Sequence, residues 1–142
     1  MRLKRKFLMI VFSAMILAGL WCSTALADDF DVNVKYYSKP LDNGYKVSAV
    51  ISPFPGNEYG LSYLENVYML VTRNGQVYKR VQLDQADLNS QTQYTTVSIT
   101  ITESGSYAFT ICMDNDDYEI GKTAAGGEEN IARHYVNISG IE

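Results

Sequence analysis

The segment from residue 96 to residue 102 constrains the fold more than any other part of the sequence. Its apolar and hydroxyl-bearing side chains alternate strictly, with Val97, Ile99 and Ile101 separated by Thr96, Ser98, Thr100 and Thr102. A period of two places successive side chains on opposite faces of an extended strand, and β-branched residues crowd a helix. The segment therefore predicts a strand with one buried face and one wet face, and such a strand needs neighbours.

The same two-residue period recurs through most of the remaining chain. Strands are expected over residues 30–36, 45–51, 66–83 and 107–113, and a last short strand is expected at residues 136–138. Asn74-Gly75 divides the third of these segments into a hairpin, because this pair readily takes the positive φ angles of a tight turn. The only helical signal is a short turn beginning at Asp84, a capping residue. The count and spacing predict an all-β fold, a seven-stranded antiparallel β-sandwich.

The first 27 residues are typical of a cleaved Sec-type signal peptide. A basic start over residues 2–6 precedes an apolar run over residues 7–21, and Ala25-Leu26-Ala27 matches the small-x-small cleavage pattern. Two alternatives are a membrane anchor and lipid attachment at Cys22. The run is shorter than the ~20 apolar residues of a membrane span, and the bulky Trp21 is unlike the small residues that precede a lipid-modified cysteine. Both alternatives are therefore disfavoured.

The expected mature chain, residues 28–142, is a single domain that is secreted, periplasmic or at the cell surface, with no membrane insertion. It carries sixteen acidic and eight basic residues, a net charge near −8, because four of the twelve basic residues lie in the signal. A field of this sign repels nucleic acid and anionic lipid surfaces. Cys112 is its single cysteine, so no internal disulfide can form. We expect Cys112 to be half-buried in a strand, with a reactive or intermolecularly bonded thiol as the alternative.

Residues 103–109, Glu-Ser-Gly-Ser-Tyr-Ala-Phe, resemble the corner of immunoglobulin-like domains, in which an acidic residue, a small residue and Gly or Ala precede Tyr-x-Cys. Tyr107 takes the tyrosine position and Phe109 replaces the cysteine, as in disulfide-free bacterial immunoglobulin-like, PKD-like and fibronectin-III-like modules. The resemblance implies an immunoglobulin-like β-sandwich without a disulfide, in which the Tyr107 hydroxyl bonds back to nearby backbone. It implies no particular function, because such sandwiches serve many.

The same resemblance implies that two loops, residues 52–63 (B–C) and 114–133 (F–G), emerge at one end of the domain. Four aromatic residues on these loops are candidate ligand-binding residues: Phe54, Tyr59, Tyr63 and Tyr118. Aromatic side chains supply large contact areas at small entropic cost, so such loops suit protein or glycan recognition. The alternative is that these rings cover the open end of the core.

The start of the second loop concentrates acidic residues, with candidate metal ligands at Asp114, Asp116, Asp117 and Glu119. A weak Ca²⁺ site would relieve the repulsion among these carboxylates. The spacing does not match an EF-hand, because Glu119 falls where that loop needs glycine. The favoured alternative is a solvated acidic loop that aids solubility, and no cofactor is otherwise expected.

Catalysis has little support in the sequence. His134 is the only histidine, and motifs for nucleophilic, metal-dependent or phosphate chemistry are missing, so we do not expect an enzyme. The first functional hypothesis is a binding or adhesion module that recognises a protein or glycan through its B–C and F–G loops. The alternatives are a structural subunit of a surface assembly, self-associating through sheet edges, and a secreted protease inhibitor that lacks the loop motifs of the chagasin-like family.

Overall fold

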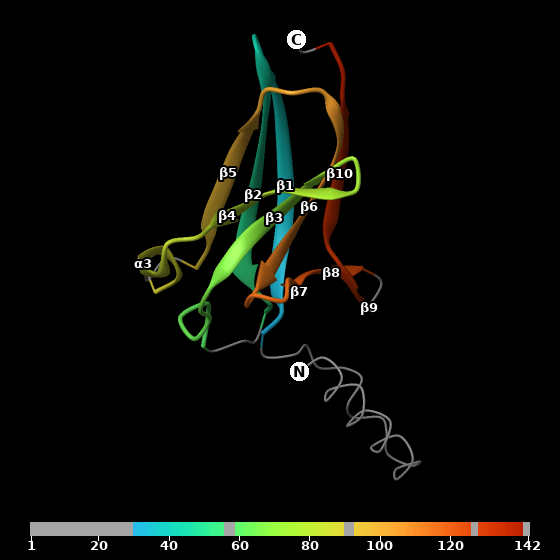
Figure 1. Cartoon of the computed structure of the whole chain (residues 1–142). Coiled ribbons are helices and arrows are strands. Elements are labelled where there is room, and N and C mark those ends of the chain that lie inside the picture. Colours follow the sequence, from blue (N-terminus) through green and yellow to red (C-terminus); the bar gives the residue numbers. More distant parts are fainter. Residues whose placement is uncertain (1–29, 56–58, 90–92, 126–127, 141–142) are drawn as a thin grey trace.

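The computed structural model describes residues 30–55, 59–89, 93–125 and 128–140, so the predicted signal peptide lies outside the described part. One sheet, sheet A, has the strand order β5-β2-β1-β8-β9, and the other, sheet B, has the order β10-β6-β3-β4 with β7 paired to β6 (Figure 1). The strands of sheet A are β1 (Val32–Leu41), β2 (Gly44–Pro53), β5 (Thr95–Ile101), β8 (Gly121–Ala125) and β9 (Glu128–Ile131). Those of sheet B are β3 (Val67–Arg73), β4 (Gln76–Gln82), β6 (Gly105–Met113), β7 (Tyr118–Glu119) and β10 (Arg133–Ile138).

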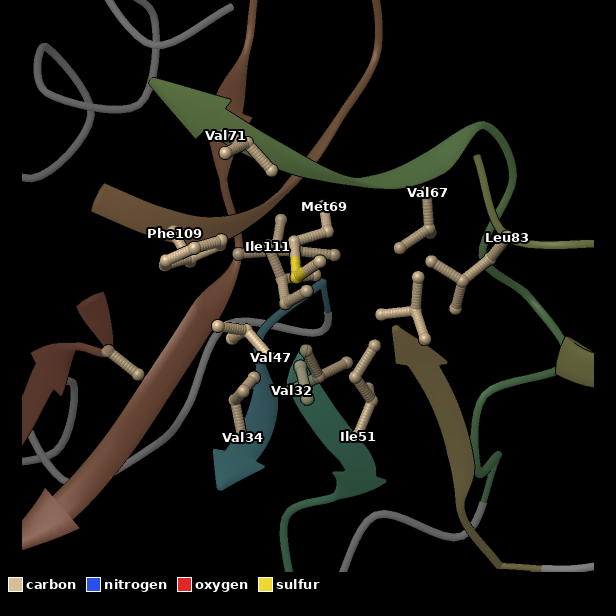
Figure 2. Packing of buried hydrophobic residues seen from close by; sticks show 14 of the residues in the cluster. Val32, Val34, Val47, Ile51, Val67, Met69, Val71, Leu83, Phe109 and Ile111 are labelled. Carbon is tan, nitrogen blue, oxygen red and sulfur yellow. The ribbon is translucent and has the colours of Figure 1, made fainter. Parts of the chain in front are cut away.

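The hydrophobic core lies between the two sheets. Val47 and Ile51 of β2 face Met69 of β3 and Phe109 and Ile111 of β6, and all five are fully buried (Figure 2). In β2 burial follows the two-residue period, whereas residues 67–69 of β3 and 109–113 of β6 are buried consecutively. The all-β, two-sheet prediction is confirmed.

Two local predictions are also confirmed. Asn74 and Gly75 have φ angles of 51° and 83°, which are those of a tight hairpin turn between β3 and β4. The short helix α3 (Gln85–Leu88) begins after Asp84, whose carboxylate accepts a hydrogen bond from the Ala86 amide at 3.1 Å. Leu88 is the residue through which this turn enters the core.

The predicted corner at Tyr107 has the expected hydrogen bond. Its Oη donates to the carbonyl of Glu103 at 2.7 Å, and the Tyr107 and Phe109 rings lie near-parallel with centroids 6.3 Å apart. The connection is further fixed by Arg73, whose Nε and Nη2 donate to the carbonyl of Ser104 at 3.0 and 2.6 Å. The corner is thus tied to the end of β3.

The prediction of seven antiparallel strands differs from the structure, which has ten strands and one parallel pairing within its described residues. The additional strands are β7, β8 and β9, all within residues 114–133, which had been expected to form a single long loop. They contain two to five residues each, too few for a period to show. The parallel pairing joins β8 to β1, with Val32 opposite Gly121. A Cβ on Gly121 would lie 3.2 Å from both Ile111 and Val34, so this strand lies close over the core.

Candidate functional site

The connection between β2 and β3 carries a small aromatic cluster at one end of the sandwich. The ring of Tyr63 contacts those of Tyr59 and Phe30, with centroid separations of 6.1 Å and 6.2 Å, and the Tyr59 contact is edge-to-face. Tyr59 is 64% exposed, whereas Tyr63 is half-buried and packs against the core. We call Phe30, Tyr59 and Tyr63 the aromatic end.

The four predicted aromatic residues therefore have different surroundings. Tyr59 and Tyr63 come together, Phe54 is half-buried, and Tyr118 is half-buried against the hydrophobic core. Only Tyr59 presents most of its ring to solvent. Phe30 belongs to the cluster but was not singled out in the sequence, where its alternation with polar neighbours indicated only the start of a strand.

The acidic segment after β6 is a tight turn clamped by two arginines. Arg80 of β4 donates from Nε and Nη2 to both carboxylate oxygens of Asp117, at 2.9 and 2.7 Å. Arg133 of β10 binds Glu119 in the same way, at 2.8 Å for each bond. Bidentate pairs of this kind are among the stronger hydrogen bonds in proteins. They raise the pKa of both arginines above the ordinary value.

A buried tyrosine also holds this turn in place. Tyr68 of β3 is 4% exposed, and its Oη donates to the carbonyl of Asp114 at 2.7 Å and contacts the carboxylate of Asp117. Burial, followed by the hydrogen bond and charge of Asp117, raises the pKa of the Tyr68 phenol. We call Tyr68, Arg80, Asp117, Glu119 and Arg133 the clamp.

The candidate calcium ligands are not assembled into a coordination sphere. Among the described residues, no group of three or more His, Cys, Asp or Glu side chains could hold a metal ion. Asp117 and Glu119 are directed to different arginines, and arginine relieves the repulsion that calcium was invoked to relieve. Calcium binding remains a prediction from sequence that this geometry does not support.

A shallow cavity of about 210 Å³ lies on the outer face of sheet B beside the clamp. Its lining residues are Leu70, Thr72, Ala108, Phe109, Thr110, Glu119, Arg133 and Tyr135. Sequence reasoning missed this feature, because the strands that supply its floor and rim are far apart in the chain. Small residues at two adjacent positions, Ala108 and Thr72, are opposite each other in the β3–β6 register and leave the hollow.

Cys112 and His134 have structural surroundings. Cys112 was expected to be half-buried but is fully buried, and burial raises the pKa of its thiol to about 12, which argues against a reactive thiol. His134 stacks on Tyr36 with ring centroids 5.2 Å apart, and its Nε2 lies 2.7 Å from Ser38 Oγ. Burial lowers the pKa of His134. These contacts join β10 to β1 across the two sheets.

Comparison with known proteins identifies no relative. No protein-family model matches the chain, and no curated protein and no solved structure shows significant similarity to it. Within the described residues, no helix is long and apolar enough to cross a membrane.

Proposed function

We propose that this chain is an exported, non-catalytic binding module of the immunoglobulin-like type, which recognises a protein or glycan partner through the aromatic end. The observation that carries the proposal is the exposed Tyr59 ring, held edge-on by Tyr63 on a rigid sandwich. Aromatic side chains whose orientation is fixed by neighbours lose little entropy on binding. The predicted signal peptide supports export, and the corner at Tyr107 supports the proposed fold type.

Site-specific photo-crosslinking in the producing cells tests this proposal. A photoreactive phenylalanine analogue at position 59 should capture a partner, whereas the same analogue at position 135 should not. Tyr135 is a matched control because it is 68% exposed but lies on the outer face of sheet B, in β10. Equal capture at both positions, or capture at position 135 alone, would contradict the proposal.

A second candidate function is assembly through the edge of sheet A that β5 forms. This strand ends sheet A, pairs over all seven residues with β2, and contains no charge, proline or glycine. Natural edge strands usually carry such residues to prevent strand addition. Ser98→Lys should then abolish concentration-dependent self-association seen by light scattering, and a monomer at all concentrations would rule out this function.

A further inference from the structure

The outer face of sheet A has a regular arrangement that the proposed function does not use. The register aligns three rows across β1, β2 and β5, and each row runs perpendicular to the strands. The rows are Lys39–Lys46–Thr100, Tyr37–Ser48–Ser98 and Lys35–Val50–Thr96. We call this surface the lysine face. It lies on the long β1–β2 hairpin, whose tip stands at the top of Figure 1.

The lysine face contrasts with the charge of the whole domain. Of the eight basic residues after the predicted signal, four form ion pairs with Asp or Glu: Arg73, Arg80, Lys122 and Arg133. Three of the other four, Lys35, Lys39 and Lys46, lie on this one face, and no ion pair joins them to any described residue. The strands β1, β2 and β5 contain no Asp or Glu. These strands thus carry three lysines and no carboxylate, and Asp42 lies in the turn that joins β1 and β2.

Two of these lysines are placed where they repel each other. Lys39 and Lys46 are direct cross-strand partners, and like charges at such positions destabilise a hairpin. An anion placed between them would remove this repulsion. Lys35 and Lys39 lie four residues apart on one strand, about 13 Å at the rise of an extended chain, so the charges are distributed along a strip.

The side chains between the lysines are suited to sugar rings. Tyr37 stands between Lys35 and Lys39 on the same face and is 56% exposed. Ser48 and Ser98 continue its row, with their Oγ atoms 2.8 Å apart. An aromatic ring supplies an apolar surface for the C–H face of a sugar, and hydroxyls can both donate and accept hydrogen bonds.

We propose that the lysine face binds an anionic polysaccharide, a chain of sugars that carry carboxylates. The carboxylates would pair with the three ammonium groups, and a sugar ring would stack on Tyr37. A flat strip fits an extended polymer better than an enclosed small molecule. Double-stranded DNA is less suitable, because base-edge recognition needs an element that enters a groove and the net charge of the domain repels its dense phosphates.

Binding to polygalacturonate, measured by biolayer interferometry on the protein as its cells process it, tests the proposal. At low ionic strength the triple variant K35Q/K39Q/K46Q should bind at least tenfold more weakly than the wild type, and Tyr37→Ala severalfold more weakly. Binding should also weaken steeply between 0.05 and 0.5 M NaCl, because exposed charges are screened over a few ångströms at high salt. Thermal unfolding of each variant verifies that it is folded.

Lys79→Gln is the matched control, because Lys79 of β4 is the one other basic residue without an ion pair among the described residues. It should leave polygalacturonate binding unchanged, and so should Tyr59→Ala, which separates this proposal from that for the aromatic end. Poly-L-glutamate, which has carboxylates but no sugar rings, should bind more weakly than polygalacturonate and respond little to Tyr37→Ala. Failure to bind polygalacturonate, equal loss in Lys79→Gln, or stronger binding to DNA or to phosphatidylglycerol vesicles would overturn the proposal.

Discussion

The two outer faces of the sandwich use positive charge in opposite ways. On sheet B, Arg80 and Arg133 each bind a carboxylate of the chain itself and hold the turn after β6 in place. On sheet A, Lys35, Lys39 and Lys46 lie together without an ion pair to any described residue. Arginine suits fixed bidentate contacts, whereas lysine is a flexible point charge. The comparison indicates that Arg80 and Arg133 on sheet B serve cohesion, whereas the three lysines on sheet A are the ones we propose to be available to a ligand.

The largest expected difference between the faces is in stability. Tyr68→Ala should lower the free energy of unfolding by about 3 kcal/mol, because it empties a buried site and removes the hydrogen bond to Asp114. Tyr37→Ala, on the exposed lysine face, should change it by less than about 0.5 kcal/mol. Urea unfolding of both variants measures the two values. Comparable losses would show that the outer face of sheet A is also structural.

Alkaline pH should weaken the fold through sheet B. Burial raises the pKa of the Cys112 thiol to about 12 and that of the Tyr68 phenol above its ordinary 10. The folded state therefore holds these protons more tightly than the unfolded state, so their contribution is complete below about pH 9 and declines as the pH rises further. Urea titrations from pH 7 to 11 should show this decline, and Tyr68→Phe should make it shallower. A flat profile would contradict the burial argument.

A smaller effect is expected when one arm of the clamp is removed. Arg133→Gln deletes both hydrogen bonds to Glu119, but the pair is partly exposed, so we expect a loss of about 1 kcal/mol or less. Thermal unfolding at low and high salt measures it. Lys35→Gln is the control on the opposite face and should produce no loss.

The smallest expected effect has the opposite sign. Lys46→Gln removes the repulsion with Lys39 and should stabilise the domain by about 0.3 kcal/mol at low ionic strength. The gain should shrink as salt is added, because salt screens the repulsion in the wild type. Destabilisation by Lys46→Gln would mean that the lysine contributes to the fold rather than to a ligand surface.

The features predicted correctly from the sequence are those that depend on neighbouring residues. The Asn74-Gly75 hairpin, the Asp84 cap and the Tyr107 corner each lie within a few residues, and their signals are local. The alternation of apolar and polar side chains also predicted which residues of the long strands face the core. The extra strands could not be found in this way, because β8 is stabilised by a parallel pairing with β1, almost ninety residues earlier.

The candidate surfaces depend even more on long-range register. Nothing in the sequence joins Arg80 to Asp117 or Arg133 to Glu119, so the acidic segment resembled a solvated loop or a calcium site. Lys39 and Lys46 are seven residues apart, and only the pairing of β1 with β2 shows that they are direct partners. The tyrosines of the B–C loop were recognised by composition, whereas their different burial follows from packing.

The contacts that join the first strand to the last also have a kinetic consequence. Tyr36 donates to the carbonyl of Ala132 and Ser38 meets His134, each pair being separated by 96 residues. Contacts of such long range close late and slow the folding of β proteins. A chain that emerges N-terminus first from a ribosome or a translocation pore thus holds β1 with β2 as its only sheet partner until β8 has emerged, and without the side-chain contacts to residues 132–134 until these follow. The edge of β1 opposite β2 is then available to chaperones that hold unfolded chains. Truncation before Ala132 should leave a chain that cannot complete its fold.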